Sequence, residues 1–513
     1  MQAGRAPGRH RLAWPRRLPG RYWLALAVIA AAGAVLRLHG LGALSLNFDE
    51  GATSYFAHLP LRDLWGPPAR LETNPPLFYT VERGVVLVLG NGAGTLRAAS
   101  VVAGVLCIPA AAFIARRLGG RAAGVAAALL VATSAISIVS SQDARAYSML
   151  TLAALIAIAA EIWLLEAYHR PDPHRGSARA GAWASYVIAS LAALYLHNTA
   201  VVMVAVLNLL AALYWISVLR AQRRFAVHWI GANAVIVVLY AFWLPVISYQ
   251  SVHALAKFWL PVPTPTDLRY AMMAIYAQLY LRALQPVPDA LFLAAGLAGV
   301  VFYRSNRIAL GLAVFVVLGA PVLSWLISQW RPIMNGKTLL WLVPVFLVLV
   351  ALGCTRVRRL AVPLTALLVL VQLAACYRLF QTRWDEAFPE VASVLRANAH
   401  DGDAIYLDPP SEEILLNYYG WPRDRLRVYA QPGPDPWFRS FDGTPLAAVD
   451  AGQLDHEPRV WVLTRANQAE RHALAQRLGG TMTEVRDQTF GHGLLRNLAL
   501  RNLELSLFVT KPE

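Results

Sequence analysis

The chain has 513 residues, of which 57% are hydrophobic and only 15% are charged. Soluble globular proteins carry about 25% charged residues, so this composition excludes an ordinary soluble enzyme and indicates an integral membrane protein. The formal net charge of +16 would suit a nucleic-acid-binding protein, but the arginines recur in alternate loops between apolar runs. We therefore expect membrane lipids among the partners of this chain, and no nucleic acid.

The first 380 residues contain about eleven apolar runs, each long enough to cross a hydrocarbon core about 30 Å thick. Arginine clusters fall in every second loop between these runs, beginning at Arg5, Arg116, Arg170, Arg220, Arg304 and Arg356. This alternation is the positive-inside pattern of a multi-pass protein, and it predicts a cytoplasmic N-terminus. The predicted spans lie near 22–38, 98–115, 122–140, 147–167, 182–196, 199–219, 229–248, 289–303, 308–328, 338–354 and 360–380.

We predict three parts of the chain. Residues 1–21 form a basic cytoplasmic tail, residues 22–380 an α-helical polytopic membrane domain, and residues 381–513 a soluble extracytoplasmic domain. In the last part FPEVASVLRANA and EEILLNYYG predict helices, and DAIYLD, RVWVLTR and LELSLFVT predict strands, which is typical of a small α/β domain. Two predicted outer loops are long, at 39–97 and 249–288. In the first, LPLRDLW and LFYTVERGVVLVL predict helices that lie along the membrane surface.

Two adjacent carboxylates, Asp49 and Glu50, follow the first span in the sequence NFDE. Neighbouring side chains on a helix point about 100° apart, so the two would have different roles. Asp49 is a candidate general base that takes a proton from an acceptor hydroxyl. Glu50 could bind the acceptor, orient an arginine or hold a cation. The alternative is a solvated loop pair that caps a surface helix.

Three basic residues are predicted on the same outer side of the membrane. Arg145, in SQDARAYSM after the third span, carries a planar fork that matches two phosphate oxygens. Arg331 and Lys337 precede the tenth span in RPIMNGKTLLWLVP. All three positions suit the phosphate of a lipid at the outer surface. The alternative for each is an anchor that contacts ordinary lipid head groups.

Further polar and aromatic residues in the predicted outer segments are candidate functional residues. Two of these segments have an ordinary structural explanation: the Pro-Pro pair in ETNPPLFY can end one helix and start another, and a single histidine is often a hydrogen-bonded structural residue. The candidates are Glu72, Asn74 and Tyr79 in ETNPPLFY, Tyr147 in SQDARAYSM, His197 in LYLHNTA, and Trp259 in KFWLP.

Taken in order, the segments NFDE, NPPLFY, SQDARAYSM, LHN and KFWLP resemble the motif series of the GT-C glycosyltransferases. The likeness is to bacterial enzymes similar to protein O-mannosyltransferases and to lipid A aminoarabinose transferase, and it covers nearly all of residues 22–420. It implies the GT-C fold in a bacterial cytoplasmic (inner) membrane, with the active site between the first outer loop and the membrane. It also implies a sugar donor carried on a polyprenyl phosphate, with a lipid, a glycan or a protein as acceptor.

The resemblance implies roles for particular residues. Asp49 would be the base, and Arg145 would hold the donor phosphate with help from Lys337. The cavity would be lined by Tyr147, His197 and Trp259. We predict a direct displacement, which inverts the anomeric centre of the sugar.

This chain departs from the family pattern at two places. Many members have histidine where this chain has Asn74, and Arg-Tyr where it has Lys337 and Thr338. The first change removes a potential metal ligand. A divalent metal therefore remains a candidate cofactor, but the sequence does not identify its ligands. The second keeps a positive charge but loses the planar fork of arginine.

Two other functions fit a protein with many spans and outer cations. One is a flippase or transporter of a lipid-linked sugar, which would break no bond. Transporters concentrate polar features near the membrane midplane, whereas ionisable residues are sparse inside the predicted spans. The other is an oligosaccharide ligase or polymerase, which acts on a longer glycan donor.

Overall fold

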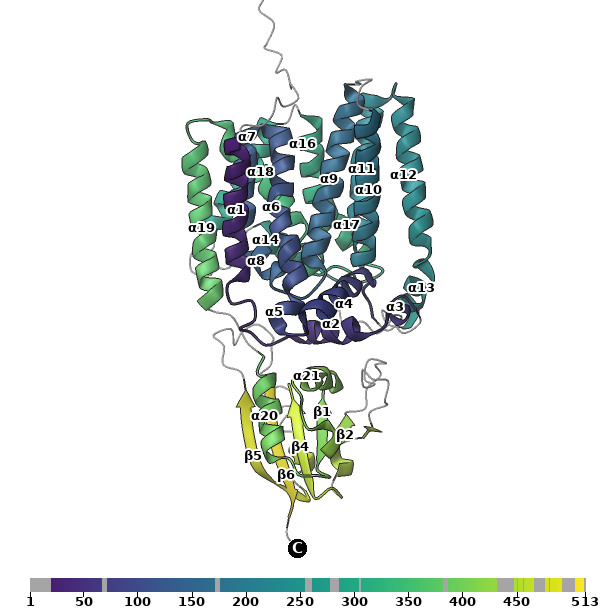
Figure 1. The fold of residues 1–513 in the computed structure, drawn as a ribbon, viewed down its shortest axis with the longest axis vertical. Helices are drawn as coiled ribbons and strands as arrows, with labels where there is room; N and C mark the ends of the chain where they lie inside the picture. The colour runs from purple at the N-terminus through teal and green to yellow at the C-terminus, as the bar shows by residue number, and fades with distance from the viewer. Residues whose placement is uncertain are drawn as a thin grey trace, which may run out of the picture.

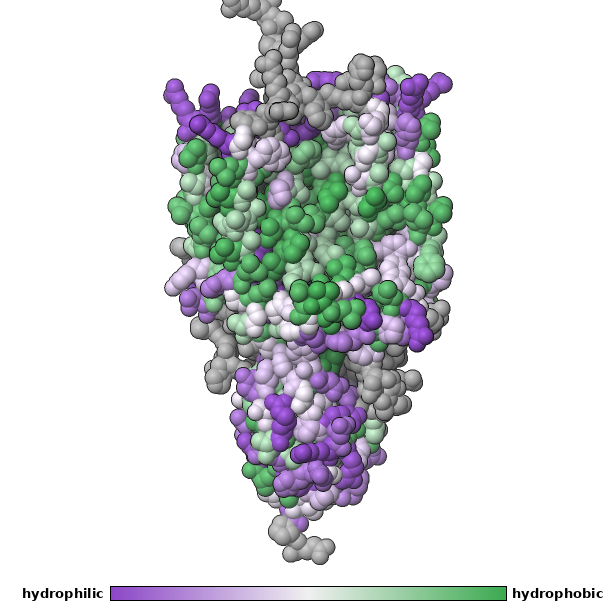
Figure 2. All heavy atoms as spheres, in the orientation of Figure 1, coloured by the Kyte–Doolittle hydropathy of each residue, from purple (hydrophilic) through white to green (hydrophobic). Residues whose placement is uncertain are grey.

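The computed structural model describes residues 20–66, 72–170, 176–253, 261–276, 286–303, 306–381, 386–430, 447–449, 451–454, 456–465, 476–478, 480–490 and 503–511. These residues form a bundle of long helices, a layer of shorter helices at one end of the bundle, and a sheet domain beyond that layer (Figure 1). On the face that Figure 2 shows, an apolar band crosses the bundle, and hydrophilic residues predominate on the sheet domain and gather at the opposite end of the bundle. This distribution is that of a protein inserted in a membrane.

Most predicted apolar runs coincide with a helix or a bent helix. The run 229–248 is an exception, because its helix ends at Ala241 and a separate helix begins at Leu244. Among the described residues, seven helices are long and apolar enough to cross a membrane, or eight if the bent pair of α7 and α8 counts as one span. The helices α15 and α18 are apolar but shorter. The bundle contains α1 (Gly20–Leu38), α6 (Ala98–Gly119), α7 (Arg121–Thr133), α8 (Ala135–Ser141), α9 (Tyr147–His169), α10 (Gly176–Leu196), α11 (Ala200–Tyr214), α12 (Arg223–Ala241), α15 (Pro286–Phe302), α16 (Arg307–Gly311), α17 (Gly319–Ser328), α18 (Leu342–Arg356) and α19 (Ala361–Gln381). Two π-helical segments, Trp215–Leu219 and Leu312–Leu318, continue α11 and join α16 to α17.

The short helix α15 belongs to the bundle because it packs very closely on α18. A Cβ atom on Gly299 would lie 2.1 Å from the carbonyl oxygen of Leu349, and one on Gly353 would lie 1.9 Å from that of Ala295. Only glycine allows two backbones to approach in this way, and small residues at helix contacts are typical of membrane bundles.

The predicted span 122–140 is not one straight helix, which corrects that part of the sequence analysis. The chain bends by 60° between α7 and α8, because Ser134 leaves the helical conformation and its side chain accepts a hydrogen bond from the backbone N–H of Ser137. A bend of this kind frees backbone carbonyl groups, which must find other donors inside a membrane. Those of Val131 and Ala132 accept hydrogen bonds from the guanidinium of Arg37, both at 3.1 Å.

The layer at the end of the bundle corresponds to the two long predicted loops. Its helices are α2 (Phe48–His58), α3 (Leu61–Leu64), α4 (Leu77–Leu89), α5 (Ala93–Leu96) and α13 (Leu244–His253). Helix α14 (Pro265–Tyr276), which also comes from the second loop, packs instead against α15, α17 and α18 of the bundle. The predicted surface helices in LPLRDLW and LFYTVERGVVLVL correspond to α3 and α4, and α2, α3, α4 and α5 lie between the bundle and the sheet domain (Figure 1).

The C-terminal domain is a sheet with helices, as predicted. Six strands lie in the order β3-β2-β1-β4-β6-β5, with β1, β2, β3 and β4 parallel and β6 antiparallel to both of its neighbours. Helix α21 lies at the edge of the sheet domain that faces the layer of short helices (Figure 1). The elements are α20 (Phe388–Asn398), β1 (Ala404–Asp408), α21 (Glu413–Tyr418), β2 (Arg427–Ala430), β3 (Ala447–Ala448), β4 (Arg459–Thr464), β5 (Met482–Phe490) and β6 (Leu503–Thr510).

Candidate active site

The sequence NFDE builds its own helix start. The side chain of Asn47 accepts a hydrogen bond from the backbone N–H of Glu50, and the carboxylate of Glu50 accepts one from the backbone N–H of Asn47, both at 3.1 Å. This reciprocal pair is a capping box, which satisfies N–H groups that the first turn of a helix leaves free. Asp49 and Glu50 therefore both lie in the first turn of α2.

Glu50 points into the protein and pairs with an arginine. Its two carboxylate oxygens lie 2.7 Å from Nε and 2.7 Å from Nη2 of Arg97, and Oε1 also accepts a hydrogen bond from the backbone N–H of Ala144 at 3.0 Å. Of the roles considered for Glu50, these contacts support the orientation of an arginine. Sequence reasoning missed Arg97, although an arginine in a predicted outer loop stands against the positive-inside pattern and could have been noticed on that ground.

Asp49 faces the other way and is surrounded by positive charge. The Nζ atom of Lys337 lies 3.4 Å from its Oδ2, and Nη1 of Arg145 donates a hydrogen bond to its backbone carbonyl at 3.3 Å. Burial by itself raises the pKa of Asp49, but Arg145 and Lys337 outweigh burial and hold the pKa below its ordinary value. Since its side chain is 37% exposed, Asp49 presents an ionised, accessible carboxylate.

Asp143 is a second acidic residue of this site, and the sequence analysis did not single it out. Burial, together with the negative charges of Glu50 and Asp49, raises the pKa of its carboxyl to about 6. Its Oδ1 atom has no hydrogen-bond partner among the described residues. The pKa of Lys337 is in turn raised above its ordinary value, because Asp143 and Asp49 outweigh the effect of burial. Lys337 therefore stays charged, in contact with Asp49 and under the influence of the charge of Asp143.

A small pocket opens beside Arg145, and five of the predicted site residues line it. The phenol oxygen of Tyr79 accepts a hydrogen bond from Nη1 of Arg145 at 3.2 Å. The rings of Tyr147 and His197 lie 6.1 Å apart. Burial and the charge of Arg145 lower the pKa of His197 to about 4, so its imidazole is neutral near pH 7. The pocket is lined by Asn74, Phe78, Tyr79, Arg145, Ala146, Tyr147 and His197.

The remaining predicted residues have other positions. Glu72 is buried, and its Oε1 accepts hydrogen bonds from the backbone N–H and the side-chain amide of Asn74, at 2.9 and 2.8 Å. It therefore orients Asn74 instead of lining the pocket itself. Arg331 is exposed just beyond α17 and does not line the pocket. Trp259 lies outside the described residues. Within the described part of the chain, no group of three or more His, Cys, Asp or Glu side chains could hold a metal ion.

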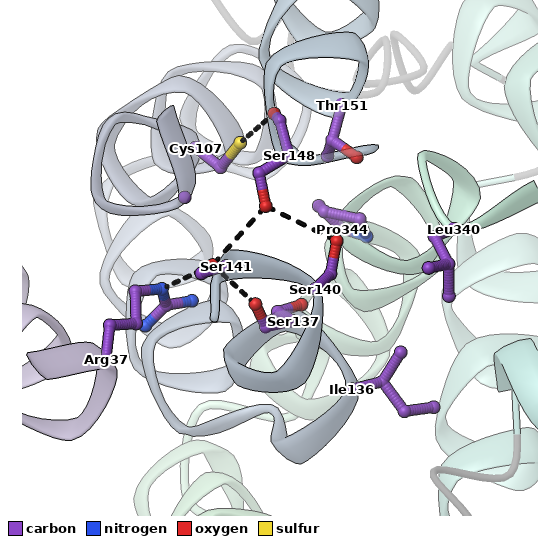
Figure 3. A pocket seen from close by; sticks show the side chains of 11 residues that line it. Arg37, Cys107, Ile136, Ser137, Ser140, Ser141, Ser148, Thr151, Leu340 and Pro344 are labelled. Atoms are coloured by element: carbon purple, nitrogen blue, oxygen red, sulfur yellow. Dashed lines mark hydrogen bonds between the residues drawn. The ribbon is translucent and has the colours of Figure 1, made fainter. Parts of the chain in front are cut away.

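A second pocket, lined by hydroxyl groups, lies where α7 and α8 bend (Figure 3). The Nε atom of Arg37 donates to Ser141 Oγ at 3.2 Å, Ser148 Oγ donates to Ser141 Oγ at 3.5 Å, and the hydroxyls of Ser140 and Ser148 are 3.3 Å apart. Because Arg37 also binds the carbonyl groups freed by the bend, this cluster holds the bent pair against α1 and α9. No motif in the sequence predicted this cluster.

Comparisons with known proteins bear on the fold. No family model matches the sequence, and no curated protein matches it. The structure is similar to that of ArnT from Cupriavidus metallidurans, with 14% identity over 95% of this chain and 98% of that chain, at a TM-score of 0.62 for the apo state and 0.61 for the form bound to undecaprenyl phosphate. It is also similar to the Archaeoglobus fulgidus oligosaccharyltransferase in complex with Zn and sulfate, with 13% identity over 89% of this chain and 70% of that chain and a TM-score of 0.51. Both are GT-C proteins, so the chain has the GT-C fold, as the order of its sequence motifs predicted.

Proposed function

We propose that this protein is a glycosyltransferase that moves a sugar from a polyprenyl-phosphate donor to an acceptor hydroxyl. The observation that carries the proposal is the accessible carboxylate of Asp49, which contacts Lys337, while Arg145 binds the backbone carbonyl of Asp49 and lines the adjacent pocket. A displacement at a sugar phosphate requires a base for the acceptor hydroxyl and cations for the departing phosphate. The GT-C fold, which ArnT bound to undecaprenyl phosphate shares, supports a lipid-linked donor.

In the proposed reaction Asp49 takes the proton of the acceptor hydroxyl, and the acceptor oxygen attacks the anomeric carbon. The bond between that carbon and the phosphate oxygen breaks, and the polyprenyl phosphate leaves with the bonding electron pair. Arg145 and Lys337 stabilise the negative charge that grows on the phosphate, and because they are already held in place they need not reorganise. Attack from the face opposite the leaving group inverts the anomeric centre.

The residues around the pocket have supporting roles in this proposal. Tyr79 holds one N–H of Arg145 and so fixes the direction of its guanidinium. Tyr147 and the neutral His197 offer flat, polar surfaces for a sugar, and Asn74, oriented by Glu72, offers an amide. The neutral state of His197 also avoids a third positive charge beside Arg145.

We also propose that the site faces the outer side of a bacterial cytoplasmic (inner) membrane, with the N-terminus in the cytoplasm. The three cysteines of the chain, Cys107, Cys354 and Cys376, are buried, so a single new cysteine can be labelled selectively. A cysteine at exposed Arg62 should react with an impermeant thiol reagent added outside intact cells, and one at exposed Arg358 should not. The opposite result would reverse the orientation.

The test of function is turnover of a prenyl-phosphate monosaccharide by the purified protein in lipid. We expect cleavage of the donor, a product of inverted anomeric configuration, and loss of transfer in Asp49→Asn without loss of donor binding. Arg145→Ala should weaken donor binding. Asp63→Asn is the matched control, because Asp63 is an acidic residue of the same loop whose ion pair within the described part of the chain is with exposed Arg62.

Each rival function predicts a different result in the same experiment. A flippase would move the lipid-linked sugar between leaflets with no bond cleavage. A ligase or polymerase would cleave an oligosaccharide donor and leave the monosaccharide donor intact. Retention of the anomeric configuration would contradict the direct displacement.

A further inference from the structure

The sheet domain contacts the segment that leads into α2. The backbone N–H of Leu46 donates a hydrogen bond to the phenol oxygen of Tyr419 at 2.7 Å. Leu46 is fully buried and directly precedes Asn47, the residue that caps α2. The hydroxyl of Ser45 donates to the backbone carbonyl of Glu386. Two consecutive residues before the cap are therefore held by the C-terminal domain.

Helix α21 also packs directly on α2. A Cβ atom on Gly51 would lie 2.7 Å from Cδ2 and 3.3 Å from Cγ of Leu415, closer than ordinary carbon atoms approach. Next to this contact, the phenol of Tyr418 donates a hydrogen bond to the backbone carbonyl of Asn91 at 2.7 Å. The NYYG sequence that begins at Asn417 thus supplies two tyrosines that contact the layer of short helices.

The membrane domain holds the same segment from the other side. Arg97 donates hydrogen bonds to the backbone carbonyl groups of Leu41, Leu44 and Ser45, at 2.7, 3.1 and 2.9 Å, in addition to its pair with Glu50. The backbone before α2 is therefore fixed between Arg97, which directly precedes α6, and Tyr419 of the sheet domain.

We propose that the C-terminal domain is a positioning element of the catalytic site, in which Tyr419 and Leu415 set the direction of α2 and thereby the place of Asp49. The inference rests on the proposed function, and it assigns to this domain a role in the chemical step. The side chain of Asp49 is partly exposed, and it contacts Lys337 at 3.4 Å. Because few contacts among the described residues hold the side chain, the direction of its carboxylate depends on the backbone of α2 that carries it. A displacement of about 1 Å in a catalytic group can lower a rate about 100-fold.

The first test changes the contact between α2 and α21. We expect Gly51→Ala to lower kcat at least about 10-fold, with KM for the donor changed less than about twofold, because the added methyl displaces α2 from Leu415. Leu415→Val, combined with Gly51→Ala, shortens the opposing side chain and should restore most of kcat. The matched control is Gly84→Ala in α4, where an added Cβ meets nothing within 4 Å. If Gly51→Ala has wild-type kcat, or if Leu415→Val fails to restore it, the inference is wrong.

The second test does not depend on activity. Tyr419→Phe removes the acceptor of the Leu46 N–H, so amide hydrogen exchange of residues 44–52 should rise about 10-fold or more. Tyr429→Phe is the control, because its hydroxyl bonds to Glu457 within the sheet domain and not to α2. Equal exchange in the two variants would overturn the inference. If the wild-type protein transfers no sugar but Tyr419→Phe alone loosens residues 44–52, the positioning contact is real and the proposed function is the part that fails.

Discussion

Replacing Glu50 by glutamine should strongly destabilise the folded protein, because it removes the carboxylate that pairs directly with the buried guanidinium of Arg97. The side chains of Arg97 and Glu50 are 5% and 1% exposed, and both carboxylate oxygens are used. Removing one partner of such a buried pair costs about 3–5 kcal/mol in the free energy of unfolding. Glutamine keeps one acceptor oxygen in place, so we expect the lower end of that range, about 3 kcal/mol.

The assay is equilibrium unfolding of the purified protein in mixed micelles, with a surface pair as the control. Arg62 and Asp63 form an ion pair whose side chains are 85% and 34% exposed, so Asp63→Asn should cost less than about 1 kcal/mol. The double variant Glu50→Gln with Arg97→Gln should be less destabilised than the sum of the single variants, because it removes the uncompensated charge. Equal losses in Glu50→Gln and Asp63→Asn, or full additivity in the double variant, would refute the argument from burial.

Three further predictions concern charge and backbone contacts. In Lys337→Met the pKa of Asp49 should rise, because Lys337 helps to lower it. The acid limb of the profile of kcat/KM against pH should therefore move to higher pH. If the limb does not move, Asp49 is not the group whose ionisation the limb reports. Because the pKa of Asp143 is raised from 3.8 to about 6, the folded state binds this proton more tightly, and the wild type should lose stability as the pH rises from about 4 to about 6. Thermal unfolding of Asp143→Asn over the same range should lack that loss. Arg37→Gln should destabilise the protein by about 3 kcal/mol, since buried carbonyl groups without a donor cost about 1–3 kcal/mol each, whereas Arg62→Gln in the same unfolding assay should change stability little.

The sequence was enough to predict the elements that depend on local pattern. Apolar runs of membrane length correspond to helices of the bundle, and the capping sequence NFDE begins a helix because its contacts join residues three apart. In the sheet domain the apolar runs in DAIYLD and LELSLFVT correspond to strands β1 and β6. Strand β5 was missed because it pairs with β6 alone at the edge of the sheet, and most of its middle residues are exposed and polar, so it lacks the apolar run that marks a buried strand.

Features that join distant residues could not be predicted in the same way. The pair of Glu50 and Arg97 links residues 47 positions apart, and no local pattern encodes it. The bend at Ser134 was missed because the apolar run continues through it, while the donor that makes the bend tolerable, Arg37, comes from another helix. The raised pKa of Asp143 depends on its burial beside Glu50 and Asp49, which only the folded chain creates.

The two adjacent carboxylates of NFDE show how one helix turn can separate support from chemistry. Because neighbours on a helix point about 100° apart, Glu50 can be fully buried against Arg97 while Asp49 stays accessible beside Lys337. The buried pair fixes the backbone, and the fixed backbone holds the exposed carboxylate among cations that keep it ionised. A single acidic residue could not do both, since the contacts that bury a carboxylate also occupy the oxygens that a base needs.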